Sequence, residues 1–156
     1  MPKRRQGLIF QPGFTLVELV VVVVLLGLLS IAALMNSSSP AELGLPSQAE
    51  TMAADIRHTQ ALANATGNRL RFSIAAGVNG SYTTSCVNVS GGACASFTQG
   101  FTASLKNNIA LSGTGAVDFD SLGQPSAAAS YTLTSGGSSK TVSVAALTGL
   151  VTVTTP

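Results

Sequence analysis

The chain has 156 residues, of which 46% are hydrophobic and only 9% are charged. This length predicts one compact domain with accessory segments, and alternating apolar residues that persist to the C-terminus exclude a disordered tail. Without the residues before Phe14, five basic side chains face six acidic ones, a net charge of −1. Charge therefore gives no support for a nucleic-acid partner.

The first predicted element is a membrane-spanning helix over residues 14–35. Its 22 residues would rise about 33 Å as a helix, enough for a hydrocarbon core of about 30 Å, and Glu18 is its only ionisable residue. In lipid the backbone must satisfy its own hydrogen bonds, which favours helix despite the many valines. Lys3, Arg4 and Arg5 predict a cytoplasmic N-terminus, so the rest of the chain lies across the membrane.

A secretory signal peptide and a plain anchor are the alternatives for this segment. The apolar stretch is longer than a signal core of about 7–15 residues. A carboxylate such as Glu18 costs roughly 2.5–3.5 kcal/mol within a membrane helix, and neither alternative needs it. In the simplest interpretation, Glu18 lies near the membrane surface and its side chain reaches the lipid headgroups.

The segment Gly13-Phe14-Thr15-Leu16-Val17-Glu18 resembles the processing motif of type IV prepilins and type II secretion pseudopilins. The resemblance implies that residues 1–13 are a leader, cut after Gly13 by the prepilin peptidase, and that Phe14 becomes the N-methylated first residue. It also implies that Glu18 pairs with the N-terminal amine of a neighbouring subunit. Such a buried pair is weak as net stability, but it sets registry because an unpaired carboxylate is penalised.

The resemblance also implies partners and a location. The partners are other pilin or pseudopilin subunits, contacted through the N-terminal helix, together with the peptidase and the bacterial inner membrane. The protein would cross that membrane once, hold residues 36–156 in the periplasm as a globular head, and later enter a pilus or pseudopilus.

Within the head, residues 36–40 break the regular pattern, and Ser47-Gln48-Ala49-Glu50 fits a capping box that opens a second helix ending near Gly67. Strands are predicted at 70–74, 82–89, 116–120 and 150–153, with a hairpin formed by 131–134 and 141–144. A helix followed by strands predicts an α+β fold.

A second, weaker resemblance involves the order of this helix, FDSLGQP (119–125) and TGLVTV (148–153). It is similar to H-type pseudopilins and to FimT-like minor pilins, including those of mannose-sensitive haemagglutinin pili. The similarity implies a head of two antiparallel sheets packed on the helix. Some FimT-like members bind DNA through arginines beside the C-terminal glycine, but Gly149 is followed by Leu150, Val151 and Thr152. Nucleic acid is therefore not expected as a partner.

The remaining candidate sites are few. Cys86 and Cys94 predict a local disulfide, since an exported domain with an even cysteine pair favours one. His58 is expected on a solvated helix face, and Arg69 with Arg71 on a solvated basic face. Asp118 and Asp120 share one strand face and could touch a cation, but two carboxylates are weak support for calcium. No metal, cofactor or enzyme motif is predicted.

The sequence thus predicts a minor pilin or pseudopilin that acts as a structural and assembly subunit and not as an enzyme. The alternatives are a major pilin of the filament shaft, a tip pilin that binds DNA or a surface, and an ordinary exported domain behind a cleaved signal.

Overall fold

The computed structural model describes residues 15–35, 40–88, 90, 92–94 and 97–156. It divides into two compact units, Met1–Ser37 and Ser38–Pro156.

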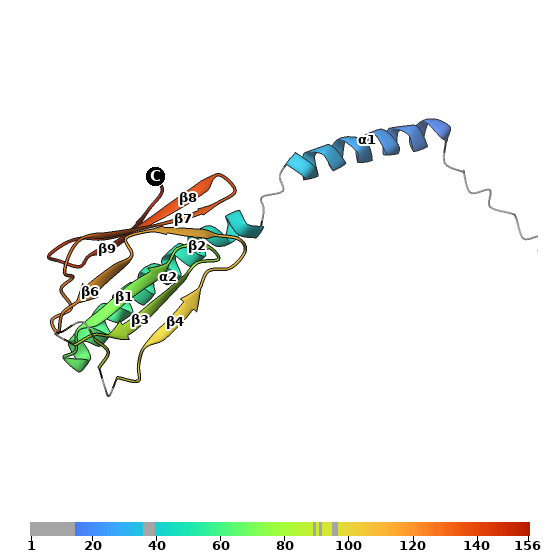
Figure 1. Cartoon of the computed structure of the whole chain (residues 1–156). Coiled ribbons are helices and arrows are strands. Elements are labelled where there is room, and N and C mark those ends of the chain that lie inside the picture. Colours follow the sequence, from blue (N-terminus) through green and yellow to red (C-terminus); the bar gives the residue numbers. More distant parts are fainter. Residues whose placement is uncertain (1–14, 36–39, 89, 91, 95–96) are drawn as a thin grey trace, which may run out of the picture. The chain divides into compact units, whose positions relative to one another are not determined.

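The first unit contains one helix, α1 (Leu16–Met35), shown in blue in Figure 1. Thr15 caps it, because its Oγ1 accepts a hydrogen bond of 3.2 Å from the backbone N–H of Glu18. The predicted helix over residues 14–35 is thus confirmed from Leu16 onward, and Phe14 lies outside the described residues. Among the residues that the structure describes, no helix has the length and apolar character needed to cross a membrane.

The second unit begins with α2 (Pro40–Thr66), which is longer than predicted. Ser47 is not an N-cap, because its hydroxyl donates to the carbonyl of Gly44 inside the helix. Pro40 occupies the first helical position, where its fixed φ and missing N–H are tolerated. The predicted C-terminal end is confirmed, since Gly67 follows the last turn with a left-handed φ of 66°.

Among the described residues, nine strands form two antiparallel sheets, so the predicted α+β fold and the two sheets are confirmed. The first sheet has the order β4-β3-β1-β6. Its strands are β1 (Leu70–Ala75), β3 (Ser81–Cys86), β4 (Phe101–Ser104) and β6 (Ala116–Phe119). The second sheet has the order β2-β5-β7-β8-β9. Its strands are β2 (Gly77–Val78), β5 (Ala110–Gly113), β7 (Ala129–Ser135), β8 (Ser138–Val144) and β9 (Val151–Thr154).

Most predicted strands exist, but several boundaries were wrong. The predicted strand 82–89 ends at Cys86, Val87 forms an isolated bridge to Ala93, and Val89 lies outside the described residues. The predicted hairpin is β7–β8, and Gly136 and Gly137 form its turn with φ of 57° and 87°. The strands β2, β4 and β5 were not predicted, because they are short and carry weak apolar alternation.

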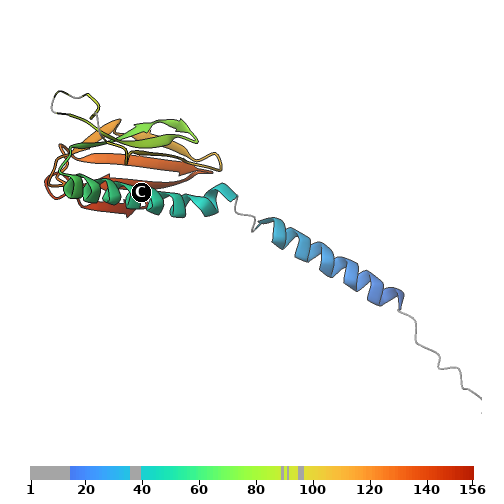
Figure 2. The same cartoon turned by 90° about the horizontal axis from the view of Figure 1, so that it is seen from below.

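The core of the head lies between α2 and both sheets (Figures 1 and 2). One face of α2 is buried at helical spacing, through Leu45, Ala49, Met52, Ala53, Ile56 and Ala63. Facing it, the ring of Phe72 packs against Tyr82 and Tyr131 at centroid distances of 5.3 and 5.6 Å. The helix therefore joins the two sheets through one continuous core.

Candidate functional site

Helix α1 presents an apolar surface on every side. All described side chains from Thr15 to Gly27 are exposed, and the Leu and Val residues among them range from 44% exposed at Val22 to 78% at Leu16. A helix that is apolar all round is ordinarily buried in a protein core or in a membrane. The exposed apolar side chains of this segment are therefore expected to be covered by a surface outside its own unit.

Glu18 is the one acidic side chain on this surface, and it lies in the first turn of α1. It occupies the third helical position, and its backbone N–H is bonded to Thr15. The partial positive charge of the helix N-terminus favours an anion at this place. Its side chain is exposed, so the carboxylate is open to a partner. Gly13 and Phe14, the predicted processing residues, lie outside the described residues.

In the head, Gln60 of α2 holds together the two segments that carry the second resemblance. Its Nε2 donates to the carbonyl of Gly149 at 2.8 Å and, more weakly, to that of Gly123 at 3.5 Å. One turn earlier, Nη2 of Arg57 donates to the carbonyl of Val151 at 2.9 Å. Neither residue was predicted as a site residue, because the sequence around a polar side chain on a helix does not indicate its distant partner.

Both segments are also ordered by local hydrogen bonds. The carboxylate of Asp120 accepts from the backbone N–H groups of Leu122 and Gln124, at 2.9 and 2.8 Å. This Asx turn uses the carboxylate within its own loop. The loop between β8 and β9 is held by a hydrogen bond of 2.9 Å, which the N–H of Ala145 donates to the carbonyl of Leu150.

Asp118 and Asp120 have separate hydrogen-bond partners: Asp118 binds arginine side chains, and Asp120 accepts from the backbone of its own loop. Asp118 binds Arg71 in a bidentate pair, with Nε at 2.6 Å from Oδ1 and Nη2 at 2.9 Å from Oδ2, and Nη2 of Arg69 lies 3.1 Å from Oδ2. The hydrogen bond from Arg71 lowers the pKa of Asp118. Asp118 thus has guanidinium partners, and the predicted solvated face of Arg69 and Arg71 is half-exposed and ion-paired.

The two cysteines are joined, as their spacing predicted. Cys86 at the end of β3 and Cys94 form a disulfide with Cα atoms 5.5 Å apart. His58 is exposed on α2, as expected, and its ring lies 5.8 Å from that of Phe101. Within the described part of the chain, no group of three or more His, Cys, Asp or Glu side chains could hold a metal ion.

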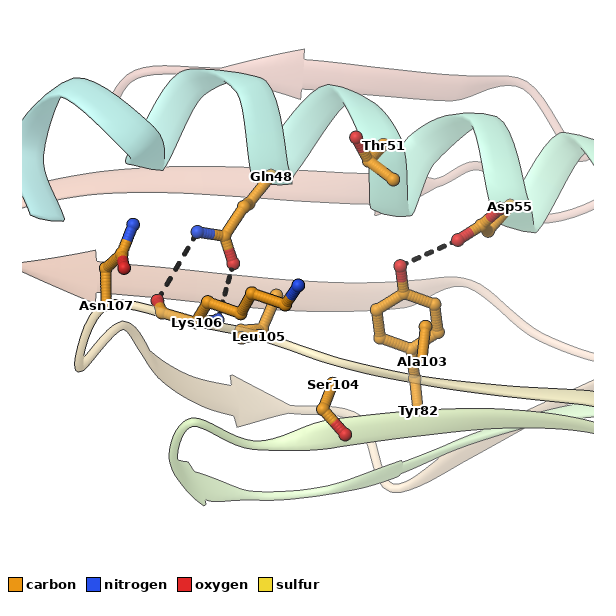
Figure 3. A pocket seen from close by; sticks show the side chains of 9 residues that line it. All are labelled: Gln48, Thr51, Asp55, Tyr82, Ala103, Ser104, Leu105, Lys106 and Asn107. Atoms are coloured by element: carbon orange, nitrogen blue, oxygen red, sulfur yellow. Dashed lines mark hydrogen bonds between the residues drawn. The ribbon is translucent and has the colours of Figure 1, made fainter.

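A cavity of about 300 Å³ lies between α2 and the segment that follows β4 (Figure 3). Two side-chain contacts cross it. Gln48 exchanges hydrogen bonds with the backbone of Lys106, and the hydroxyl of Tyr82 donates to Asp55 at 2.7 Å. Burial and this carboxylate raise the pKa of Tyr82. Because these contacts attach the helix to the first sheet, the cavity is a gap between two structural contacts.

Comparison with known proteins adds two findings. Residues 10–34 match the model of the prokaryotic N-terminal methylation motif. The chain is also similar to a solved structure of the type IV minor pilin FimU of Pseudomonas aeruginosa, with a TM-score of 0.59 and 12% identity over 74% of this chain and 94% of that one. A second crystal form of FimU gives a TM-score of 0.55 and 12% identity over 72% and 97%. No curated protein sequence matches.

The comparisons thus concern two different parts of the chain: the methylation motif in its N-terminal segment and a fold similar to that of a type IV minor pilin.

Proposed function

We propose that this protein is a minor subunit of a type IV pilus or of a type II secretion pseudopilus. It serves assembly and structure and is not an enzyme. The single observation that carries the proposal is the match of residues 10–34 to the N-terminal methylation motif. The FimU-like fold supports the minor role, and the alternative within the class is a major pilin of the filament shaft.

In this proposal the prepilin peptidase cuts after Gly13, removes residues 1–13 and methylates the amine of Phe14. Residues 14–35 anchor the subunit in the inner membrane, with the head in the periplasm, before it enters the filament. The exposed Leu and Val side chains of α1 support this, because lipid or neighbouring helices would cover them.

Glu18 is proposed to receive the N-terminal amine of a neighbouring subunit. Its place in the first turn of α1 and its exposure support the role. In a low-dielectric surrounding an unpaired carboxylate is penalised, so subunits settle where the carboxylate meets a cation. The pair would thereby set the axial register between neighbours.

The test compares Glu18→Ala with Glu50→Ala, which removes an exposed acid from α2 and serves as the matched control. Both variants should enter the membrane and yield a mature chain that starts at Phe14 by N-terminal sequencing. Only Glu18→Ala should be missing from sheared filaments. Normal incorporation of this variant would refute the pairing role, and a native chain that starts beyond Ser30 would refute the whole proposal.

Copy number separates the minor from the major role. A minor subunit should be a small fraction of the pilin in purified filaments, measured by quantitative mass spectrometry. A chain that makes up most of the filament would instead be the major pilin.

A further inference from the structure

Three exposed leucines lie on two neighbouring loops of the head. Leu122 follows β6, and Leu147 and Leu150 lie between β8 and β9, with exposed fractions of 70%, 84% and 63%. We refer to these three residues as the leucine patch. The other exposed large hydrophobic residues among the described residues of the head are Leu43 and Val78. Three of the five exposed large hydrophobic residues in the described part of the head thus lie on one pair of loops.

The two loops are fixed to each other through α2. Gln60 donates from one nitrogen to the carbonyls of Gly123 and Gly149, the neighbours of Leu122 and Leu150 in the chain. The Asx turn at Asp120 orders the first loop from within. The leucine patch is therefore preformed, and a partner that binds it would not need to order the loops first.

Leu147 is held in a conformation that disfavours leucine. Its φ is 67°, in the left-handed region, where a residue with a Cβ is strained unless its side chain can bond locally. The other non-glycine residues with positive φ in the described part of the chain are Asn79, Asn107 and Asn108, the residue type that tolerates this region. A leucine at this place is unfavourable because its backbone is strained and its apolar side chain is exposed to water. We therefore infer that the side chain makes a contact outside the head.

The chemistry of the loops indicates the kind of partner. Residues 119–125 and 145–150 contain no Lys or Arg, and their one acid, Asp120, is bonded within its own loop. One basic side chain from α2, Arg57, lies beside Leu150, where it donates to the carbonyl of Val151. A nucleic acid or an anionic lipid surface would require several basic side chains here. An uncharged apolar protein surface requires none.

The size of the patch narrows the partner further. Three leucines can bury roughly 200–350 Å², whereas a stable interface buries about 800 Å² on each partner. The patch alone is too small to hold a free protein. It would suffice between subunits that another contact already keeps together, because tethering raises the effective concentration to about the millimolar range.

We propose that the leucine patch docks on an uncharged apolar face of the head of a neighbouring pilin-like subunit in the same filament. This inference rests on the proposed function, since the N-terminal helix supplies the tether. The patch then selects which subunit lies next to this one, while Glu18 sets the axial register.

The test uses the full chain in cells that assemble filaments. A photo-crosslinking amino acid at Leu147 should yield a product with another subunit that carries the methylation motif, identified by mass spectrometry. The product should disappear when Glu18→Ala prevents assembly. In parallel, the triple variant Leu122→Ser, Leu147→Asn, Leu150→Ser is compared with Val78→Ser, which makes a similar change at another exposed position, 67% exposed.

The triple variant should be processed normally and its head should unfold at an equal or higher temperature, because Asn tolerates the backbone of Leu147. Its recovery in sheared filaments should fall at least about tenfold, which is less than the roughly 10²–10⁴-fold gain that avidity can give, while Val78→Ser is recovered as wild type. Equal recovery of both variants would overturn the patch inference and leave the proposed function standing. A crosslink to nucleic acid or to a protein without the motif would also overturn it. Absence of the wild-type chain from filaments would overturn both.

Discussion

Replacing Gly149 by alanine tests whether Gln60 holds the two loops of the head together. Gly149 has a φ of 65°, and a Cβ at this place would overlap Nε2 of Gln60 and lie 3.3 Å from Cδ of Pro125. The substitution therefore strains the backbone and also displaces the side chain that donates to the Gly149 carbonyl.

Each effect has an expected magnitude. A non-glycine residue in the left-handed region costs about 1–2 kcal/mol, and loss of one hydrogen bond costs about 0.5–1.5 kcal/mol. Gly149→Ala should thus lower the free energy of unfolding by about 1.5–3.5 kcal/mol. Gly67→Ala is the matched control, because Gly67 has a nearly equal φ of 66° and nothing within 4 Å of the added Cβ. Gly67→Ala should lower the free energy of unfolding by only about 1–2 kcal/mol, which is the cost of the left-handed backbone.

The assay is urea unfolding of the head, residues 38–156, which form a compact unit. A double-mutant cycle completes it. In a Gln60→Ala background the clash is absent, so Gly149→Ala should cost about 1 kcal/mol less than in the wild type. Equal costs for Gly149→Ala and Gly67→Ala, or strict additivity with Gln60→Ala, would refute the role given to Gln60.

Three further predictions concern the core, the ion pairs and the disulfide. The hydroxyl of Tyr131 is buried and has no hydrogen-bond partner among the described residues, so Tyr131→Phe should leave the free energy of unfolding unchanged or raise it by about 1–2 kcal/mol. Tyr82→Phe should lower the free energy of unfolding by a similar amount, because it removes the hydrogen bond to Asp55. Urea unfolding that ranks the two variants the other way would contradict this. Because Arg71 lowers the pKa of Asp118 in the folded head, the pair stabilises the head at pH values above the unfolded pKa of about 4, and this stabilisation is lost as the pH falls through the lower folded pKa. The free energy of unfolding, measured from pH 6 to pH 2, should depend less on pH in Asp118→Asn than in the wild type. An unchanged dependence would exclude this contribution. Reducing the disulfide between Cys86 and Cys94 should lower the free energy of unfolding by about 2.5 kcal/mol in the chain-entropy model, since the cysteines are 8 residues apart. An equal free energy of unfolding in oxidised and reduced protein would show that the loop closure contributes nothing.

Local patterns were sufficient for the helices and for most strands. The strict alternation of Leu70 and Phe72 with Arg69 and Arg71 predicted β1, and the glycine pair at 136–137 predicted the β7–β8 turn. These signals depend only on neighbouring residues, so the chain displays them without its fold. The start of α2 was misplaced because Ser47 and Glu50 mimic a capping box inside a helix that begins at Pro40.

Short edge strands could not be found in the same way. The strand β4 has four residues of intermediate or full exposure, and β2 has two exposed residues. Their hydrogen bonds come from β3 and β5, whose positions depend on the packing of the sheets. Nothing in their own sequence distinguishes them from loops.

The sequence by itself determined the methylation motif, the single acid in an apolar helix, the cysteine pair and the α+β order of elements. These features depend on residue type and on short spacing along the chain. Only the tertiary structure decided that Asp118 binds Arg69 and Arg71, that Gln60 joins the loops at Gly123 and Gly149, and that three leucines lie exposed on those loops. Such contacts join residues tens of positions apart, and they form only when sheet register and helix packing bring the chain segments within hydrogen-bond distance.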